Sequence, residues 1–250
     1  MKPGKVYLVG AGPGVPDLLT LKAAALLKRA EVVIYDRLVH DETLALCNPE
    51  AEQIYMGQPV GKHASRQNEI HSLLLEKAQE GKIIVRLKGG DPFLFGRGGE
   101  EAEFLAEHGI PFEVVPGVSA ALAAPLAACI PVTHRDVASS VAIVTGHEIE
   151  GSSRIDWDAL GKLDTLVFLM GVHNLRRIVQ NLIAHGRGPE TPAALIQSAF
   201  WPSQRIVSGT LADIVCEAAR AGIQPPATLI VGNAVKLGEK LRSCRASEAH

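Results

Sequence analysis

Short runs of β-branched and aliphatic residues alternate with helical patterns through the first half of the chain, and this alternation limits the possible folds more than any other feature. Candidate strands are Val6–Val9, Val32–Tyr35 and Ile83–Leu87. Before the last strand, apolar residues recur at helical spacing up to Gly81; they are Ile70, Leu73, Leu74 and Ala78. A second helix is expected over residues 101–108, before Gly109. Strands that alternate with helices are typical of βαβ units, so the sequence predicts an α/β fold with a mainly parallel N-terminal sheet.

The pattern changes near residue 116. Pro116 and Gly117 interrupt the strand-like run before them, and the sequence becomes Ala-rich afterwards. Further elements are expected as strands at Val141–Val144 and Leu166–Leu169, a helix over 174–185, and an antiparallel pair of Ala193–Ile196 with Ile206–Val207. We therefore expect two α/β domains, residues 1–115 and 116–241, the second with a mixed sheet. Residues 242–250 are expected to be a disordered polar tail.

The composition is that of an ordered globular protein. Hydrophobic residues make up 47% and charged residues 21% of the chain. The 25 basic and 27 acidic residues leave a net charge of −2, so we expect neither nucleic acid nor a membrane as a partner. The uncharged run 114–133 is long enough to span a bilayer, but Pro116, Gly117, Pro125 and Pro131 interrupt it. A buried segment between the domains is the favoured interpretation.

The cysteines suggest a reducing compartment. Cys47, Cys129, Cys216 and Cys244 form no CxxC pair, and no apolar leader precedes Val6. We therefore expect free thiols and a cytoplasmic location. No group of His, Cys or carboxylate residues has the spacing of a metal site, so no metal is expected.

The first candidate strand leads into Gly10-Ala11-Gly12-Pro13-Gly14, and Asp36 follows the second strand. This superficially matches a dinucleotide-binding loop with its ribose-binding acid, but the third glycine of that motif would stand where Val15 does. Pro13 also removes an N–H that such a loop needs for a pyrophosphate. The alternatives are a tight strand-to-helix turn and a ligand that approaches the backbone closely.

A long glycine-rich loop follows the third candidate strand, in the segment RLKGGDPFLFGRGGEE. Ligands of α/β sheets bind at the carboxyl ends of strands, and the glycines leave the backbone open there. Asp91 can accept hydrogen bonds from hydroxyls or an ammonium, and Arg97 offers a planar fork for carboxylates. The alternative interpretations are a turn cap for Asp91 and a solvated charge for Arg97.

Six segments, in order, resemble the tetrapyrrole methylases: VYLVGAGPG, YDRLV, RLKGGDPFLFGRGGEEA, VPGVSA, IPVTHRDVASSVAIVTGH and PPATLIVG. The resemblance covers most of the chain, from Lys5 to Gly232. The second, third and fifth segments favour the branch of the family that acts on uroporphyrinogen III.

The resemblance implies a two-domain tetrapyrrole methylase-like fold, a homodimer, and S-adenosylmethionine (SAM) folded into the cleft between the domains, with S-adenosylhomocysteine as its product. Small residues suit this cofactor because they let backbone groups reach it, and SAM carries no phosphate. The implied cofactor contacts are Pro13, Gly89, Gly90, Asp91, Ser119, Ala120, Met170, Ala199, Ala227 and Thr228.

The implied substrate carries eight carboxylates, which a chain of net charge −2 must meet with local cations. By resemblance, the substrate-facing and catalytic residues are Arg97, Glu100, Arg135 and Met170. Glu100 lies one helical turn from Arg97 and can orient its guanidinium, whereas Arg135 could instead pair with Asp136 on the surface. His134 and His147 are further candidates as bases, although lone histidines are more often structural.

The resemblance thus predicts a SAM-dependent C-methyltransferase that converts uroporphyrinogen III to precorrin-2, by methylation at ring positions 2 and 7 through precorrin-1. Its product would serve siroheme, cobalamin or heme d1 formation. The alternatives are a methylase of later corrin intermediates or of ribosomal RNA, and a dinucleotide-dependent oxidoreductase. The chain departs from the usual family residues at four positions: Gln58 replaces a lysine, Ala64 a serine, Leu126 a tyrosine and Cys129 a glycine.

Overall fold

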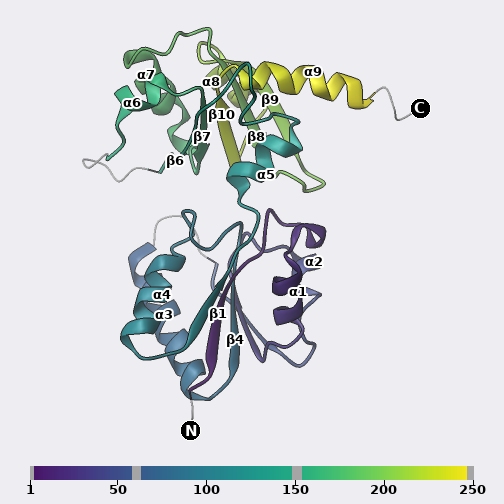
Figure 1. Cartoon of the computed structure of the whole chain (residues 1–250), viewed down its shortest axis with the longest axis vertical. Helices are drawn as coiled ribbons and strands as arrows, with labels where there is room; N and C mark the ends of the chain where they lie inside the picture. Colours follow the sequence, from purple (N-terminus) through teal and green to yellow (C-terminus); the bar gives the residue numbers. More distant parts are fainter. Residues whose placement is uncertain (1–2, 58–62, 148–153, 247–250) are drawn as a thin grey trace. The chain divides into compact units, whose positions relative to one another are not determined.

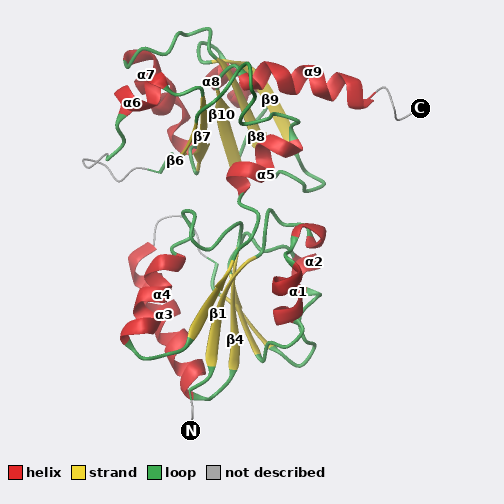
Figure 2. Cartoon of the chain, in the orientation of Figure 1, coloured by secondary structure: helices red, strands yellow, loops and turns green. Residues whose placement is uncertain are grey.

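A computed structural model describes residues 3–57, 63–147 and 154–246 (Figure 1). The chain divides into two compact units, Met1–Ser119 and Ala120–His250. They meet in sequence inside the Ala-rich segment that follows Pro116. Each unit is built on one sheet with helices on both of its faces (Figure 2).

The first unit contains a five-stranded, fully parallel sheet in the order β3-β2-β4-β1-β5. Its strands are β1 (Lys5–Gly10), β2 (Val32–Tyr35), β3 (Glu52–Tyr55), β4 (Ile83–Lys88) and β5 (Phe112–Val115). Its helices are η1 (Pro16–Leu18), α1 (Leu21–Leu27), α2 (Asp41–Leu44), α3 (His63–Gln79) and α4 (Gly98–Glu107). The α1 and α2 helices cover one face of the sheet, and α3 and α4 cover the other (Figure 1).

Local sequence explains how these elements begin and end. The Thr20 hydroxyl accepts a hydrogen bond from the Ala23 amide and caps α1. Gly81 and Gly109, which follow α3 and α4, both have a positive φ, as the sequence predicts for helix ends. Strand β4 lies in the middle of the sheet and is buried on both faces, which is usual in a parallel sheet.

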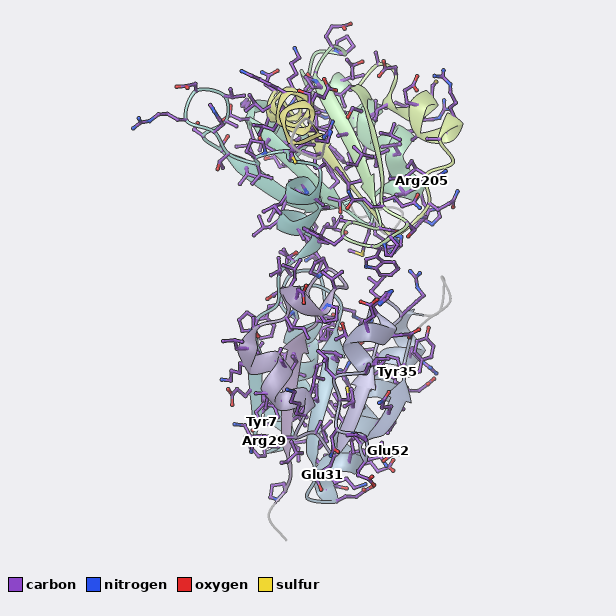
Figure 3. The ribbon with its side chains drawn as sticks, turned by 90° about the vertical axis from the view of Figure 1, so that its right-hand side faces the viewer. Tyr7, Arg29, Glu31, Tyr35, Glu52 and Arg205 are labelled. Atoms are coloured by element: carbon purple, nitrogen blue, oxygen red, sulfur yellow. The ribbon has the colours of Figure 1, made fainter. Side chains whose placement is uncertain are left out.

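The amino ends of the strands are fixed separately from the carboxyl ends. The Ile83 amide donates to Glu31 Oε2 at 2.8 Å, and the Glu52 amide donates to the Glu31 carbonyl. Glu31 and Glu52 therefore mark the end of the sheet where its strands begin, while Tyr35 lies toward the end where they finish (Figure 3). The loops that follow the strands are gathered at this second end, the carboxyl end of the sheet.

The second unit contains a mixed five-stranded sheet in the order β6-β7-β10-β8-β9. Its strands are β6 (Val141–Thr145), β7 (Thr165–Leu169), β8 (Pro192–Gln197), β9 (Arg205–Thr210) and β10 (Ala227–Val231). Its helices are α5 (Ala120–Ala127), α6 (Trp157–Lys162), η2 (Val172–Asn174), α7 (Leu175–Ala184), α8 (Ile214–Arg220) and α9 (Ala234–Ala246). Only β6 and β7 pair in parallel, and the expected antiparallel pair of β8 with β9 is present. The predicted fold class, a parallel sheet followed by a mixed one, is confirmed.

One expectation needs correction. The tail from Arg242 is helical up to Ala246, and the Arg242 side chain on α9 donates to the Ala128 carbonyl at 2.5 Å. Within the second unit, Leu122 and Leu126 on α5 are 52% and 66% exposed. No helix in the described ranges is both long enough and apolar enough to cross a membrane.

Candidate functional site

Three glycines meet at the carboxyl ends of the strands of the first sheet. Gly10 ends β1, Gly90 follows β4 and Gly117 follows β5. A Cβ at Gly10 would lie 2.6 Å from the Gly90 carbonyl oxygen, and one at Gly117 would lie 2.7 Å from the Gly10 Cα. A side chain at Gly10 or Gly117 would clash with the backbone of a neighbouring loop, so glycine is what permits the three loops to pack this closely.

Asp91 ties two of these loops together. Its Oδ1 accepts a hydrogen bond from the Phe93 amide at 2.9 Å, and its Oδ2 accepts one from the Gly117 amide at 3.2 Å. The turn cap considered for Asp91 is therefore present. Carboxylate oxygens have further lone pairs, so this cap is compatible with a contact to a ligand ammonium or hydroxyl.

Two amides of the glycine loop after β1 donate hydrogen bonds to backbone carbonyls at the end of β4 and in the loop after it. The Ala11 amide donates to the Lys88 carbonyl at 2.8 Å, and the Gly12 amide donates to the Gly90 carbonyl at 3.1 Å. The loop leads into the three-residue η1 and not into a helix whose N-terminus could hold a phosphate. The geometry thus disfavours a dinucleotide and suits a ligand without phosphates.

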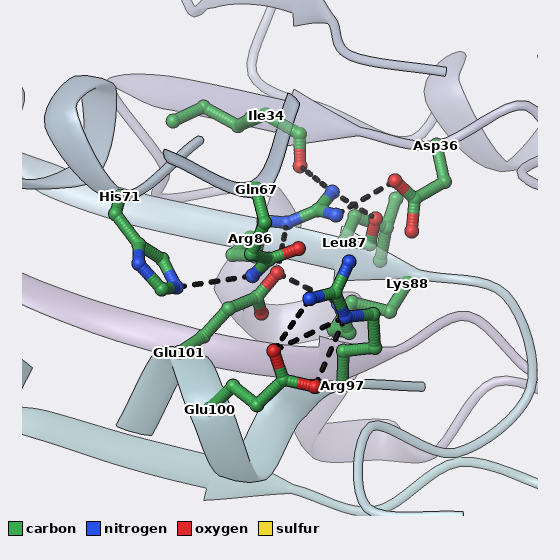
Figure 4. Close-up of polar contacts among 10 residues, drawn as sticks. All are labelled: Ile34, Asp36, Gln67, His71, Arg86, Leu87, Lys88, Arg97, Glu100 and Glu101. Carbon is green, nitrogen blue, oxygen red and sulfur yellow. Dashed lines mark hydrogen bonds and ion pairs between the residues drawn. The ribbon is translucent and has the colours of Figure 1, made fainter. Parts of the chain in front are cut away.

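Arg97 is positioned by Glu100 at the start of α4 (Figure 4). Arg97 Nε donates to Glu100 Oε1 at 3.0 Å, and Nη2 donates to Oε2 at 2.6 Å. The pairing lowers the pKa of Glu100 and raises that of Arg97. The contact expected from their spacing is present, and the two side chains remain 41% and 52% exposed.

A buried charge network lies beneath this pair and was not foreseen from the sequence (Figure 4). Glu101 Oε1 accepts from Arg86 Nε at 3.1 Å and from Lys88 Nζ at 2.8 Å. Arg86 Nη2 also reaches Asp36 Oδ1 at 2.7 Å. Charged residues two apart in a central strand, such as Arg86 and Lys88 in β4, share one face of a buried sheet. That spacing is the sequence signal that could have revealed the network.

The second unit brings four of the predicted residues to the same end of its sheet. Met170 follows β7, Ala199 follows β8, and Ala227 with Thr228 begins the antiparallel β10, where Ala227 pairs with Gln197. Met170 has a φ of 57°, and Ser198 and Phe200, on either side of Ala199, have values of 49° and 68°. A positive φ at a non-glycine residue costs roughly 1–3 kcal/mol, and such strain clusters at functional sites.

The remaining predicted residues are placed as follows. Ser119 is buried at the end of the first unit, and Ala120 begins α5 in the second. Pro13 lies in the loop after β1. Arg135 is exposed and makes no ion pair with Asp136 in the part of the chain that the structure describes. Gln58 and the side chain of Ala64 lie outside the described residues.

Of the two histidines considered as bases, His134 has a structural contact through its ring. His134 Nδ1 accepts a hydrogen bond from the Asp136 amide, and His134 pairs with Ala138 in an isolated bridge. The His147 amide donates to the Thr145 hydroxyl. The described ranges also contain no group of three or more His, Cys, Asp or Glu residues that could hold a metal ion.

The sequence matches known methylases along most of its length. The family model of the tetrapyrrole (corrin/porphyrin) methylases matches residues 5–215. A siroheme synthase of Thiobacillus denitrificans is 50% identical over 98% of this chain, and one of Pseudomonas fluorescens is 53% identical over 95%. Both alignments cover 52% of the relative, so the chain spans about half the length of these curated relatives.

Solved structures match over nearly the whole of both chains. The uroporphyrin-III C-methyl transferase of Thermus thermophilus, in complex with S-adenosyl homocysteine, is 45% identical over 94% of each chain, with a TM-score of 0.81. A cobalt precorrin-4 methyltransferase is 30% identical over 92% of this chain and 95% of its own, with a TM-score of 0.83.

Proposed function

The chain belongs to the tetrapyrrole methylases, and from this premise we propose that it methylates uroporphyrinogen III with SAM. The product is precorrin-2, formed through precorrin-1 by methylation at ring positions 2 and 7. The observation that carries this proposal is the 45% identity to the Thermus C-methyl transferase over 94% of both chains. The cobalt precorrin-4 methyltransferase is less similar in sequence, at 30% identity, so a later corrin substrate is the second candidate.

The described residues fit SAM. The amides of Ala11 and Gly12 are occupied within the protein, which suits a ligand that carries no phosphate. The Asp91 carboxylate suits the ammonium of the methionine moiety, and the buried hydroxyl of Thr228 suits a polar group of the cofactor. We assign the other cofactor contacts to Pro13, Gly89, Gly90, Ser119, Ala120, Met170, Ala199 and Ala227. When bound, SAM supplies a methyl group on a sulfonium for attack by the electron-rich pyrrole carbon.

The protein's contribution is to bind, orient and shelter the reactants. Arg97 and Arg135 are assigned to the substrate carboxylates, since a guanidinium fork binds a carboxylate with two hydrogen bonds. A proton must also leave the neighbouring meso carbon. Glu100 raises the pKa of Arg97, which makes a role for this guanidinium as base unfavourable, so its task is anchoring and electrostatics.

We further propose a cytoplasmic homodimer. The support for the dimer is α5, on which Leu122 and Leu126 lie one helical turn apart and are both more than half exposed. Apolar side chains grouped in this way suit contact with a second copy of the chain.

The test is incubation of the purified protein with SAM and uroporphyrinogen III under anaerobic conditions, followed by the spectrum and mass of the product. A gain of two methyl groups per tetrapyrrole is expected. Transfer to a later corrin intermediate, with none to uroporphyrinogen III, would support the second candidate.

A further inference from the structure

The nine-residue loop 89–97 is closed at its base by a buried ion pair. Lys88 ends β4 immediately before the loop, and Glu101 lies in the first turn of α4 immediately after it. Their side chains are 3% and 0% exposed, and Lys88 Nζ lies 2.8 Å from Glu101 Oε1. The neighbouring Glu100 faces outward and holds Arg97, so adjacent glutamates fix the buried and exposed sides of the same helical turn (Figure 4).

The two ends of this loop are held by different contacts. At the Asp91 end, Gly90 exchanges two hydrogen bonds with Gly12, and Asp91 accepts one from Gly117. At the Arg97 end, the Gly98 amide donates to the Pro92 carbonyl within the loop, and Glu101 Oε1 ties the start of α4 to β4 by accepting from both Lys88 and Arg86. Loss of the Lys88–Glu101 pair leaves Arg86 as the remaining contact of this network to Glu101, so it weakens the hold on the Arg97 end and leaves the Asp91 end in place.

The network is not an arrangement that stability alone favours. Burial, reinforced by the nearby Arg86, lowers the pKa of Lys88, which reflects the cost of keeping its ammonium charged. Glu101 shares one oxygen between two cations, and its Oε2 has no hydrogen-bond partner among the described residues. Well-packed apolar residues in such places are often equally stable or more stable than an ion pair. We therefore attribute these buried charges to a role in orienting the loop and the start of α4.

We propose, building on the proposed function, that Lys88 and Glu101 are positioning residues that aim Arg97 at the tetrapyrrole carboxylates. They touch neither ligand. Their pair fixes the start of α4 to the end of β4, and the helix start carries the Arg97–Glu100 fork. The role is specific to the tetrapyrrole, because the Asp91 end of the loop has its own anchors.

The test is the double variant Lys88→Met/Glu101→Gln. It removes one charge of each sign, so Arg86 and Asp36 remain paired, and the new amide can still accept from Arg86 Nε. Either single change leaves an uncompensated buried charge, so both single variants should be less stable than the double. We expect the double variant to fold and to keep the Kd for S-adenosylhomocysteine, while kcat/KM for uroporphyrinogen III falls by about a hundredfold.

The matched control is Lys77→Met/Glu52→Gln, which removes an ion pair between α3 and β3 in the same unit, and it should leave both readouts unchanged. Wild-type turnover in the folded double variant, or an equal loss of S-adenosylhomocysteine binding, would overturn the proposal. If the double variant does not fold, Lys88→Arg keeps the buried charge and alters only the geometry. Reduced turnover with unchanged cofactor binding then supports the role, and unchanged turnover contradicts it.

Amide hydrogen exchange separates this proposal from the function on which it builds. In the double variant, the amides of Gly98 and Glu101, which donate to the Pro92 and Arg97 carbonyls, should exchange faster by about tenfold or more, while that of Gly90 stays protected by Gly12. Uniformly unchanged exchange removes the positioning role even if the wild type is active. An inactive wild type instead contradicts the proposed function and leaves the exchange result to decide whether the ion pair holds the loop.

Discussion

Arg97 is the residue whose geometry matters most for the proposed reaction. Lysine at position 97 keeps the charge and loses the planar fork that Glu100 holds. We expect Arg97→Lys to bind S-adenosylhomocysteine normally and to lose methyl transfer by roughly ten- to a hundredfold, from about 1.5–3 kcal/mol per lost charged hydrogen bond. Arg135→Lys should be affected less, because no carboxylate in the described chain holds its guanidinium.

Steady-state rates with uroporphyrinogen III and calorimetric titration of the cofactor product measure the two effects separately. A parallel loss of both in Arg97→Lys would assign the arginine to the cofactor.

Cys47 gives a prediction about pH. Burial raises the pKa of its thiol from 9.0 to about 11. Because the folded state disfavours the thiolate, the thiol's contribution to stability is fully present below pH 9.0 and is lost as the pH rises toward about 11. The difference in free energy of unfolding between the wild type and Cys47→Ala should therefore shrink over this range, as denaturant titrations at several pH values would measure.

Labelling supplies an independent check on this environment. At pH 8, iodoacetamide should modify the exposed Cys216 in the folded protein and Cys47 only after unfolding, as peptide mass mapping would show. Rapid labelling of Cys47 in the folded protein would contradict the burial.

At the level of elements, the end of α5 shows why glycine suits the position that Cys129 occupies in this chain. The Ile130 amide donates to the Pro125 carbonyl and the Cys129 amide to the Leu126 carbonyl, which is a Schellman motif with Cys129 at its left-handed position. The φ of Cys129 is 54°, a value that glycine adopts without strain.

Cys129→Gly should therefore raise the free energy of unfolding by about 0.5–1 kcal/mol, the released strain exceeding the added flexibility of the unfolded chain. Cys129→Ala is the control, because it shortens the side chain and keeps the strained Cβ. Thermal denaturation distinguishes them, and equal melting temperatures for the glycine and alanine variants would refute the explanation.

Sequence periodicity predicted the elements whose burial is regular and missed those that depend on context. The runs of β1, β2 and β4 are apolar enough to be recognised, whereas β3, Glu52–Tyr55, is a largely exposed edge strand with little pattern. The Arg97–Glu100 contact followed from helical spacing. Helical spacing does not tell which of Glu100 and Glu101 is buried. The packing of α4 on the sheet decides it, since it buries Glu101 and leaves Glu100 exposed.

At the scale of the whole molecule, the proposed dimer gives a direct prediction. Light scattering at micromolar concentration should give about twice the chain mass of 26.6 kDa. Leu126→Glu should shift the protein toward the monomer, since it places a charge on the exposed apolar face of α5. Leu241→Glu, at an exposed leucine on α9, is the matched control and should leave the mass unchanged. A wild type that is monomeric and active would contradict the dimer.

The strand order of the first sheet also constrains how the chain can fold during its synthesis. The first strand made, β1, is flanked by β4 and β5, the last two of that sheet to leave the ribosome. Until Phe112–Val115 has emerged, the strand that contains the apolar Val6, Leu8 and Val9 lacks one of its two neighbouring strands. The nascent N-terminal segment therefore exposes an apolar strand for most of the translation of this unit. This exposure makes it a target for chaperones that bind short apolar segments.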